Sequence, residues 1–407
     1  MAENKKTRHG RPYLFEVDLM RVIFIFGVLL NHTTTAFSMA MADSVSKNFL
    51  HATHLSLHFT RMGFMFMTGL VLFLNYYNRE HHWGTFWKKR YKSTGIPYLA
   101  WNAILLVATS LITGTALNGQ KFWSDFVYGV THGSNFYLYY VFVIFQLYLI
   151  FPLIVALFKR FPKNHEFMML VSILAQLMLL IAIKYWLPHV NTDSWWYIFR
   201  SYGMNILVYQ VYFMAGAYAA IHYQKVTSFI MTHAKAIEIS AGILALGTVG
   251  LYYGNTYLLK LPYSSIQIVH QPYIMIYALV MVAFVFYLGK RYAYKRTHGL
   301  NPLIEKFVAT GSKVSFGIYL SQTIPILILD NWLAKLSFIP TWAMLLALPL
   351  GYIFVVGCSF LIAYFCYKVP PFGFLIGRPN WCRKPVSKTV SKVKRQSEKV
   401  INLNETK

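Results

Sequence analysis

The chain has 407 residues, of which 57% are hydrophobic and only 13% charged, and 38 basic residues outnumber 13 acidic ones to give a net charge of +25. A soluble globular protein carries about 25% charged residues, so this composition excludes an ordinary water-facing surface and also a disordered chain. The positive charge would indicate nucleic-acid binding only if it gathered on one soluble surface, and its distribution along the chain has another explanation.

Ten apolar segments are long enough to cross the roughly 30 Å hydrocarbon core of a bilayer, which takes about 20 helical residues. They cover residues 17–41, 55–77, 96–117, 135–158, 167–187, 204–223, 237–253, 272–288, 314–333 and 342–367. The sequence therefore predicts an all-α polytopic integral membrane protein with about ten transmembrane helices, in which residues 17–367 form the membrane domain.

The basic residues lie mostly in alternate connections between these segments. With the N-terminus in the cytoplasm, 30 of the 38 fall in cytoplasmic segments, which is the asymmetry that the positive-inside rule describes. We therefore predict that both termini are cytoplasmic, with a basic N-terminal segment 1–16 and a basic tail 368–407 that contacts anionic lipid. We place the protein in the plasma membrane, and no nucleic-acid partner is needed to account for the charge.

The first predicted span contains three ionisable residues, Asp18, Arg21 and His32. Such side chains inside a span are costly and mark candidate functional sites. On a helix, the 11 positions from Arg21 to His32 turn through three revolutions plus about 20°, and Asp18 falls on the same face. We interpret His32 as a site residue with Arg21 about 16 Å nearer the cytoplasm. The alternative is that Asp18 and Arg21 are interfacial anchors and His32 is a core histidine.

Further cations lie near two other spans. Lys89 and Arg90 belong to a cluster that enters the third span from the cytoplasm, and this cluster either binds phosphate groups or forms an ordinary positive-inside flank. Arg61 lies at the outer side of the second span, where the positive-inside rule does not call for it. It either pairs with a substrate or with a carboxylate such as Asp330, or it snorkels to the surface.

Three histidines, His51, His54 and His58, follow helical spacing on a segment predicted to lie outside. Histidines spaced in this way can form a metal site, but only Asp43 lies nearby in the sequence to complete a ligand set. We therefore predict no metal and no bound cofactor.

Several of these segments resemble membrane-bound acyltransferase family 3, the integral-membrane O-acyltransferases of surface carbohydrates. The first span resembles that family's opening motif in its acidic residue, arginine and histidine, which are Asp18, Arg21 and His32. The segment RMGFMFMTGLVLF is similar to an aromatic segment that ends in a Ser-Gly pair, with Thr68 in place of serine. The segment FWKKRYKSTGIPYLAW is similar to the family's basic entry to the third span, with Arg90 at its strongest arginine.

The chain departs from the family pattern at two places. Ser93 or Thr94 stands where many members carry a second arginine, and Gln322 stands where a histidine is common. The subgroup that looks closest modifies, or was once proposed to export, poly-N-acetylglucosamine and related polymers.

The resemblance implies an enzyme that moves an acyl group, most simply acetyl, from cytosolic acyl-CoA to a hydroxyl of a cell-surface glycan or a lipid-linked sugar. Acyl-CoA is then a co-substrate, and glycan synthase subunits are further partners. The implied site consists of a catalytic His32, of Arg21, Arg90 and Lys89 as acyl-CoA-binding residues, and of Asp18, Arg61 and Gln322 as supporting residues. Asp18 would orient Arg21, and His32 would act either as a base or as a transient acyl carrier.

Two other functions fit the same residues. In an exporter of polysaccharide or lipid-linked sugar, the intramembrane charges would line a transport pathway, and no thioester would be consumed. In an accessory subunit of a glycan synthase, the residues would act only through contacts, and replacing His32 with alanine would leave activity unchanged.

Overall fold

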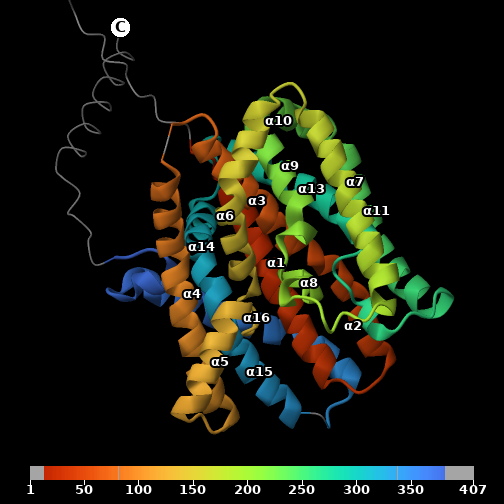
Figure 1. Ribbon diagram of the computed structural model, residues 1–407. Helices are drawn as coiled ribbons and strands as arrows, with labels where there is room; N and C mark the ends of the chain where they lie inside the picture. Colours follow the sequence, from red (N-terminus) through yellow and green to blue (C-terminus); the bar gives the residue numbers. More distant parts are fainter. Residues whose placement is uncertain (1–12, 81, 337, 381–407) are drawn as a thin grey trace, which may run out of the picture.

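A computed structural model describes residues 13–80, 82–336 and 338–380, and most of the predicted N-terminal segment and tail lie outside these ranges. The described residues form helices and no strands (Figure 1). The longer helices are α1 (Phe15–Ala40), α3 (Phe59–Tyr76), α4 (Trp83–Thr113), α6 (Tyr139–Arg160), α7 (His165–Ile181), α11 (Ala234–Tyr253), α13 (Pro272–Thr297), α14 (Pro302–Ser321) and α16 (Thr341–Lys368). The shorter helices are α2 (Val45–His54), α5 (Gly119–His132), α8 (Tyr197–Arg200), α9 (Gln210–Ile221), α10 (Tyr223–Thr232), α12 (Tyr263–Ile266) and α15 (Thr323–Lys335).

The predicted fold class is confirmed. Eight helical segments are long and apolar enough to cross a membrane, and α14 with α15 forms a ninth candidate that bends by 55°. The sixth predicted segment, 204–223, lies on a shorter apolar helix, Ile206–Ile221, which is not among these candidates. The described residues therefore contain eight spans, or nine with the bent pair, where the sequence predicts ten, and the protein is an all-α polytopic membrane protein.

The bend between α14 and α15 has a local cause. Pro325 stands in the first turn of α15, and a proline ring lacks an N–H group and clashes with the carbonyl four residues earlier, here that of Ser321. The helix accordingly ends at Ser321 and resumes at Thr323. This places the completely buried Gln322 at the joint.

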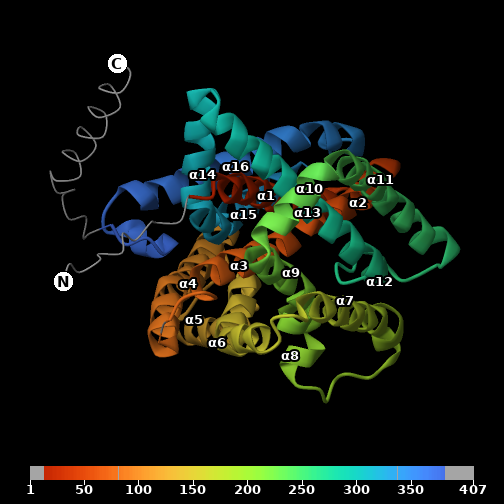
Figure 2. The ribbon, with the colours of Figure 1, turned by 90° about the horizontal axis from the view of Figure 1, so that it is seen from above.

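Helix α1 lies at the centre of the bundle. It packs against α3, α13, α14, α15 and α16, and Figure 2 shows it surrounded by these helices when the molecule is seen from above. Met20, Phe24, Ile25 and Leu29 are completely buried on it. A central helix exposes little surface to lipid, so its polar side chains face the protein interior.

Helices α3 and α9 approach so closely that their backbones touch. A Cβ atom on Gly69 of α3 would overlap the carbonyl oxygen of Phe213, and one on Gly216 of α9 would overlap the carbonyl oxygen of Phe66. Small residues of this kind allow close helix packing inside a membrane. Because the obstructing atoms belong to the backbone, a rotamer change cannot relieve the overlap.

We expect Gly216→Ala to destabilise the protein, because the added methyl group forces α3 and α9 apart. Overpacking costs about 1–3 kcal/mol. The midpoint of thermal aggregation of the detergent-solubilised protein, followed by size-exclusion chromatography, should fall. Gly242→Ala in α11 is the matched control, since a Cβ there meets open space, and it should leave the midpoint unchanged or raise it through better helix propensity. Equal midpoints for the two variants would contradict the close contact.

Candidate functional site

A cavity of about 350 Å³ lies between α1, α3, α4, α6 and α14, and the chain around Gly377 also lines it. This volume is typical of a small-molecule site. Five cations line it, Arg21, Arg61, Arg90, Lys313 and Arg378, together with His32 and His58. No aspartate or glutamate is among its lining residues in the described part of the chain.

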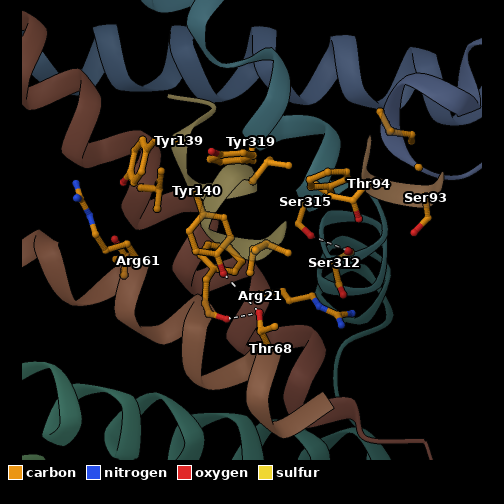
Figure 3. Close-up of a pocket in the computed structure, with 18 of the residues that line it drawn as sticks. Arg21, Arg61, Thr68, Ser93, Thr94, Tyr139, Tyr140, Ser312, Ser315 and Tyr319 are labelled. Carbon is orange, nitrogen blue, oxygen red and sulfur yellow. Dashed lines mark hydrogen bonds between the residues drawn. The ribbon is translucent and has the colours of Figure 1, made fainter. Parts of the chain in front are cut away.

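The cavity has two ends that differ in their side chains. Figure 3 shows Arg21 near Ser312, Ser315, Ser93 and Thr94 at one end, and Arg61 beside Tyr139 at the other. Arg21 lies in the second turn of α1, near its predicted cytoplasmic end. We call the Arg21 side the inner end and the Arg61 side the outer end of the cavity.

The inner end gathers cations from four parts of the chain. Arg21 comes from α1, Arg90 from α4, Lys313 from α14 and Arg378 from the segment after the 3₁₀ helix Phe372–Ile376. Arg378 lies within electrostatic reach of Arg21. The structure thus brings together the predicted Arg21 and Arg90.

Arg90 is held by aromatic rings. Its guanidinium carbon lies 5.4 Å from the ring centre of Tyr76, 5.9 Å from that of Phe86 and 6.0 Å from that of Tyr148. Cation–π contacts of this kind restrain a guanidinium without neutralising its charge. Arg90 therefore keeps a positive charge available to the cavity.

Lys89 does not join the predicted set. Its side chain is exposed, and it is absent from the residues that line the cavity. Successive helical residues point about 100° apart, so Lys89 and Arg90 face different surroundings. Lys313 and Arg378 line the inner end instead. From the sequence, both are predicted only to contribute to the positive-inside charge.

Asp18 does not line the cavity, but it accepts a hydrogen bond from Ser312, which does. It is 4% exposed, and its Oδ1 accepts hydrogen bonds from Ser312 Oγ at 2.6 Å and from Tyr13 OH at 3.0 Å. Among the ion pairs of the described residues, none joins Asp18 to Arg21. Asp18 therefore fixes Ser312 of α14 against α1, and its charge reaches Arg21 without a direct ion pair.

His32 faces the cavity. It is 7% exposed, and its ring lies against that of Tyr137, with 3.7 Å between the ring centres. Within the described ranges, no side chain or backbone group forms a hydrogen bond with its ring nitrogens, and the residue lines the cavity. In the described structure, His32 is thus held by ring packing against Tyr137 and not by a hydrogen bond to a neighbouring helix.

The three histidines of the outer segment do not converge. His54 and His58 both contact the side-chain nitrogen of Asn31, at 3.4 and 3.2 Å, whereas His51 contacts Tyr263. No group of three or more metal-ligating side chains forms among the described residues.

Arg61 and Gln322, the other two predicted supporting residues, differ in their relation to the cavity. Arg61 lines the outer end, with its guanidinium carbon 5.5 Å from the ring centre of Tyr139. It forms no ion pair with Asp330, whose side chain is exposed on the bent helix α15. Gln322 does not line the cavity, but its Nε2 donates to the carbonyl oxygen of Tyr319 at 2.9 Å, a lining residue.

A family model described as an acyltransferase domain, that of acyltransferase family 3, matches residues 14–364, from the start of α1 into α16. The chain belongs to this family. The acyltransferase is therefore an enzyme that transfers acyl groups, and the family resemblance found in the sequence is confirmed. No curated protein and no solved structure matches the chain, so the poly-N-acetylglucosamine subgroup stays a prediction.

The arrangement suits acyl transfer. The acyltransferase presents an imidazole to a cavity whose inner end is cationic, and about 16 Å of helix α1 separate Arg21 from His32. An anionic carrier bound at the inner end would thus have room to extend a reactive group toward His32.

Proposed function

We propose that the acyltransferase takes an acyl group, most simply acetyl, from cytosolic acyl-CoA and transfers it to a hydroxyl of a cell-surface glycan or a lipid-linked sugar, in the plasma membrane. The observation that carries this proposal is a cavity lined by five cations and by no described carboxylate. A lining of this charge favours a polyanionic ligand.

Coenzyme A matches the inner end in charge and shape. Its phosphate groups lie on its nucleotide portion, and arginine binds phosphate oxygens in a bidentate manner. Arg21, Arg90, Lys313 and Arg378 would together bind these phosphates. The predicted cytoplasmic side of the bundle is also the side on which acyl-CoA is present.

The long arm of the coenzyme would then run along α1 toward His32. The imidazole takes the proton from the acceptor hydroxyl as its oxygen attacks the thioester carbonyl. A transient acyl-imidazole on His32, formed before the acceptor enters, is the second route by which the same residue could act.

The acceptor would enter from the outer end, where Arg61, Asn31 and Thr60 line the cavity. The segments that connect the spans on the predicted outer side are short helices and turns. An acceptor close to the membrane surface, such as a polymer end or a lipid-linked sugar, fits this setting.

The test uses the purified protein in lipid with radiolabelled acetyl-CoA and a crude cell-surface glycan fraction. We expect label to appear in the glycan fraction and free CoA to be released in proportion. Longer acyl-CoAs tested in parallel identify the preferred acyl group. If the folded protein consumes no thioester with any acyl-CoA, the donor proposal is wrong, and the sugar exporter becomes the better hypothesis.

A further inference from the structure

Arg61 would not contact the phosphates of acyl-CoA in the proposed complex, because these phosphates bind at the inner end of the cavity. The other four cavity cations are assigned above to the inner end. Arg61 comes from the first turn of α3 and lies at the opposite end from Arg21 (Figure 3). Gly27 of α1 packs against Thr60, so this first turn lies beside the middle of α1. Arg61 is also within electrostatic reach of His32.

The charge of Arg61 has no anionic partner among residues 13–80, 82–336 and 338–380. Its neighbours are the ring of Tyr139 and the phenols of Tyr209 and Tyr319, which are neutral groups. None of the ion pairs of the described residues includes it. An uncompensated charge inside a membrane protein is costly, so a ligand that brings negative charge would recover that cost.

A second candidate donor, His58, precedes Arg61 by three positions. Its side chain contacts the same Asn31 amide nitrogen as His54 does, and the hydrogen bonds of His54 come first. Thr34 Oγ1 donates its proton to the carbonyl oxygen of Asn31, so it must accept from His54 Nδ1, which lies 2.7 Å away. In neutral His54, Nε2 is then an acceptor, and it accepts a hydrogen bond from Asn31 Nδ2.

The same amide nitrogen determines the tautomer of His58. Because Asn31 Nδ2 can only donate, His58 Nδ1 at 3.2 Å must accept. Neutral His58 therefore carries its proton on Nε2, and that atom is buried without a partner in the described structure. His58 is 4% exposed and lines the cavity, and a spacing of three helical positions puts it beside Arg61.

We propose that Arg61 and the Nε2–H group of His58 form an oxyanion site that stabilises negative charge on the acyl carbonyl oxygen. This inference rests on the proposed transfer from a thioester. The acceptor oxygen bonds to the carbonyl carbon, the carbonyl electron pair moves to its oxygen beside Arg61 and His58, and His32 takes the hydroxyl proton. The carbonyl then re-forms, the carbon–sulfur bond breaks, and the departing thiolate receives the proton from His32.

Variants at both donors test this proposal in the full-length protein in lipid. Removing one oxyanion donor costs about 10²–10³ in kcat. We expect that loss for Arg61→Gln and His58→Leu, with little change in the dissociation constant of acetyl-CoA. Arg61→Lys should lose less, and His58→Gln, whose amide can replace the Nε2–H donor, should recover most of the lost activity. The exposed Arg200 provides the control Arg200→Gln, which should match the wild type.

The slow hydrolysis of acetyl-CoA without acceptor separates the oxyanion role from acceptor binding. An oxyanion site serves both reactions, so hydrolysis should fall with transfer in Arg61→Gln. If the variant instead raises KM for the acceptor and leaves hydrolysis intact, Arg61 anchors the acceptor and the inference fails. Equal activities of His58→Gln and His58→Leu would likewise overturn the donor role of His58. A wild-type protein that consumes no thioester would refute the proposed function as well.

Discussion

We expect His32→Ala to abolish acyl transfer while acyl-CoA binding stays nearly unchanged. The imidazole lines the cavity and has no hydrogen-bond partner in the described part of the chain, whereas the cations proposed to hold the donor lie at the inner end. Loss of a general base reduces the rate by about 10²–10⁴. Transfer of radiolabel to the glycan fraction measures the loss, and equilibrium binding of acetyl-CoA to the protein in lipid measures the donor affinity.

The exposed His189 gives the matched control, since His189→Ala removes an imidazole without touching the cavity and should retain full activity. Equal loss of binding in His32→Ala and in the inner-end variants would contradict the separation of roles. Acid quenching of the wild type with donor alone distinguishes the two routes, because an acyl-imidazole accumulates only if His32 carries the acyl group.

The second large effect is expected at the inner end. Arg21→Gln should raise the dissociation constant of acetyl-CoA about 10- to 100-fold, because a hydrogen bond to a charged group contributes about 1.5–3 kcal/mol. At saturating donor, kcat should change little, since Arg21 lies far from the reacting carbonyl. The wild-type affinity should also weaken with added salt, which screens charge interactions with the exposed Lys313 and Arg378.

Lys89→Gln is the control for this experiment. Lys89 neighbours Arg90 in sequence but is exposed and does not line the cavity, so its loss should leave the donor affinity unchanged. A drop in affinity in Lys89→Gln as large as in Arg21→Gln would show that overall surface charge, rather than the cavity, attracts the donor.

Helical periodicity was sufficient to place Arg21 and His32 on one face, because both belong to a single helix whose geometry depends only on the spacing between them. Periodicity alone could not show that Lys89 lies outside the cavity. The orientation of α4 is fixed by contacts with α6, in which Trp87 Nε1 donates to the carbonyl oxygen of Tyr148 and Tyr91 OH donates to that of Phe145. These tertiary contacts turn Arg90 toward the cavity and leave Lys89 outside it.

The remaining site residues depend on contacts between distant segments. Arg378 follows the end of α16 by ten residues, and nothing in its local sequence indicates that it returns to α1. The free donor on His58 depends on Asn31, which belongs to a different helix. Asp330, considered as a partner for Arg61, lies on α15, and the bend at Gln322 changes the direction of that helix.

The unequal distribution of cations in the cavity also affects how turnover is controlled. In the proposed complex, four of the five would bind the portion of the donor that the reaction leaves unaltered, so spent coenzyme A would retain nearly all the anchoring contacts of its acylated form. Departure of the spent carrier would then compete with chemistry as the slowest step, and free coenzyme A in the cytosol would act as an inhibitor. The rate of surface acylation would follow the ratio of acylated to free coenzyme A, which couples the modification to the metabolic state of the cell.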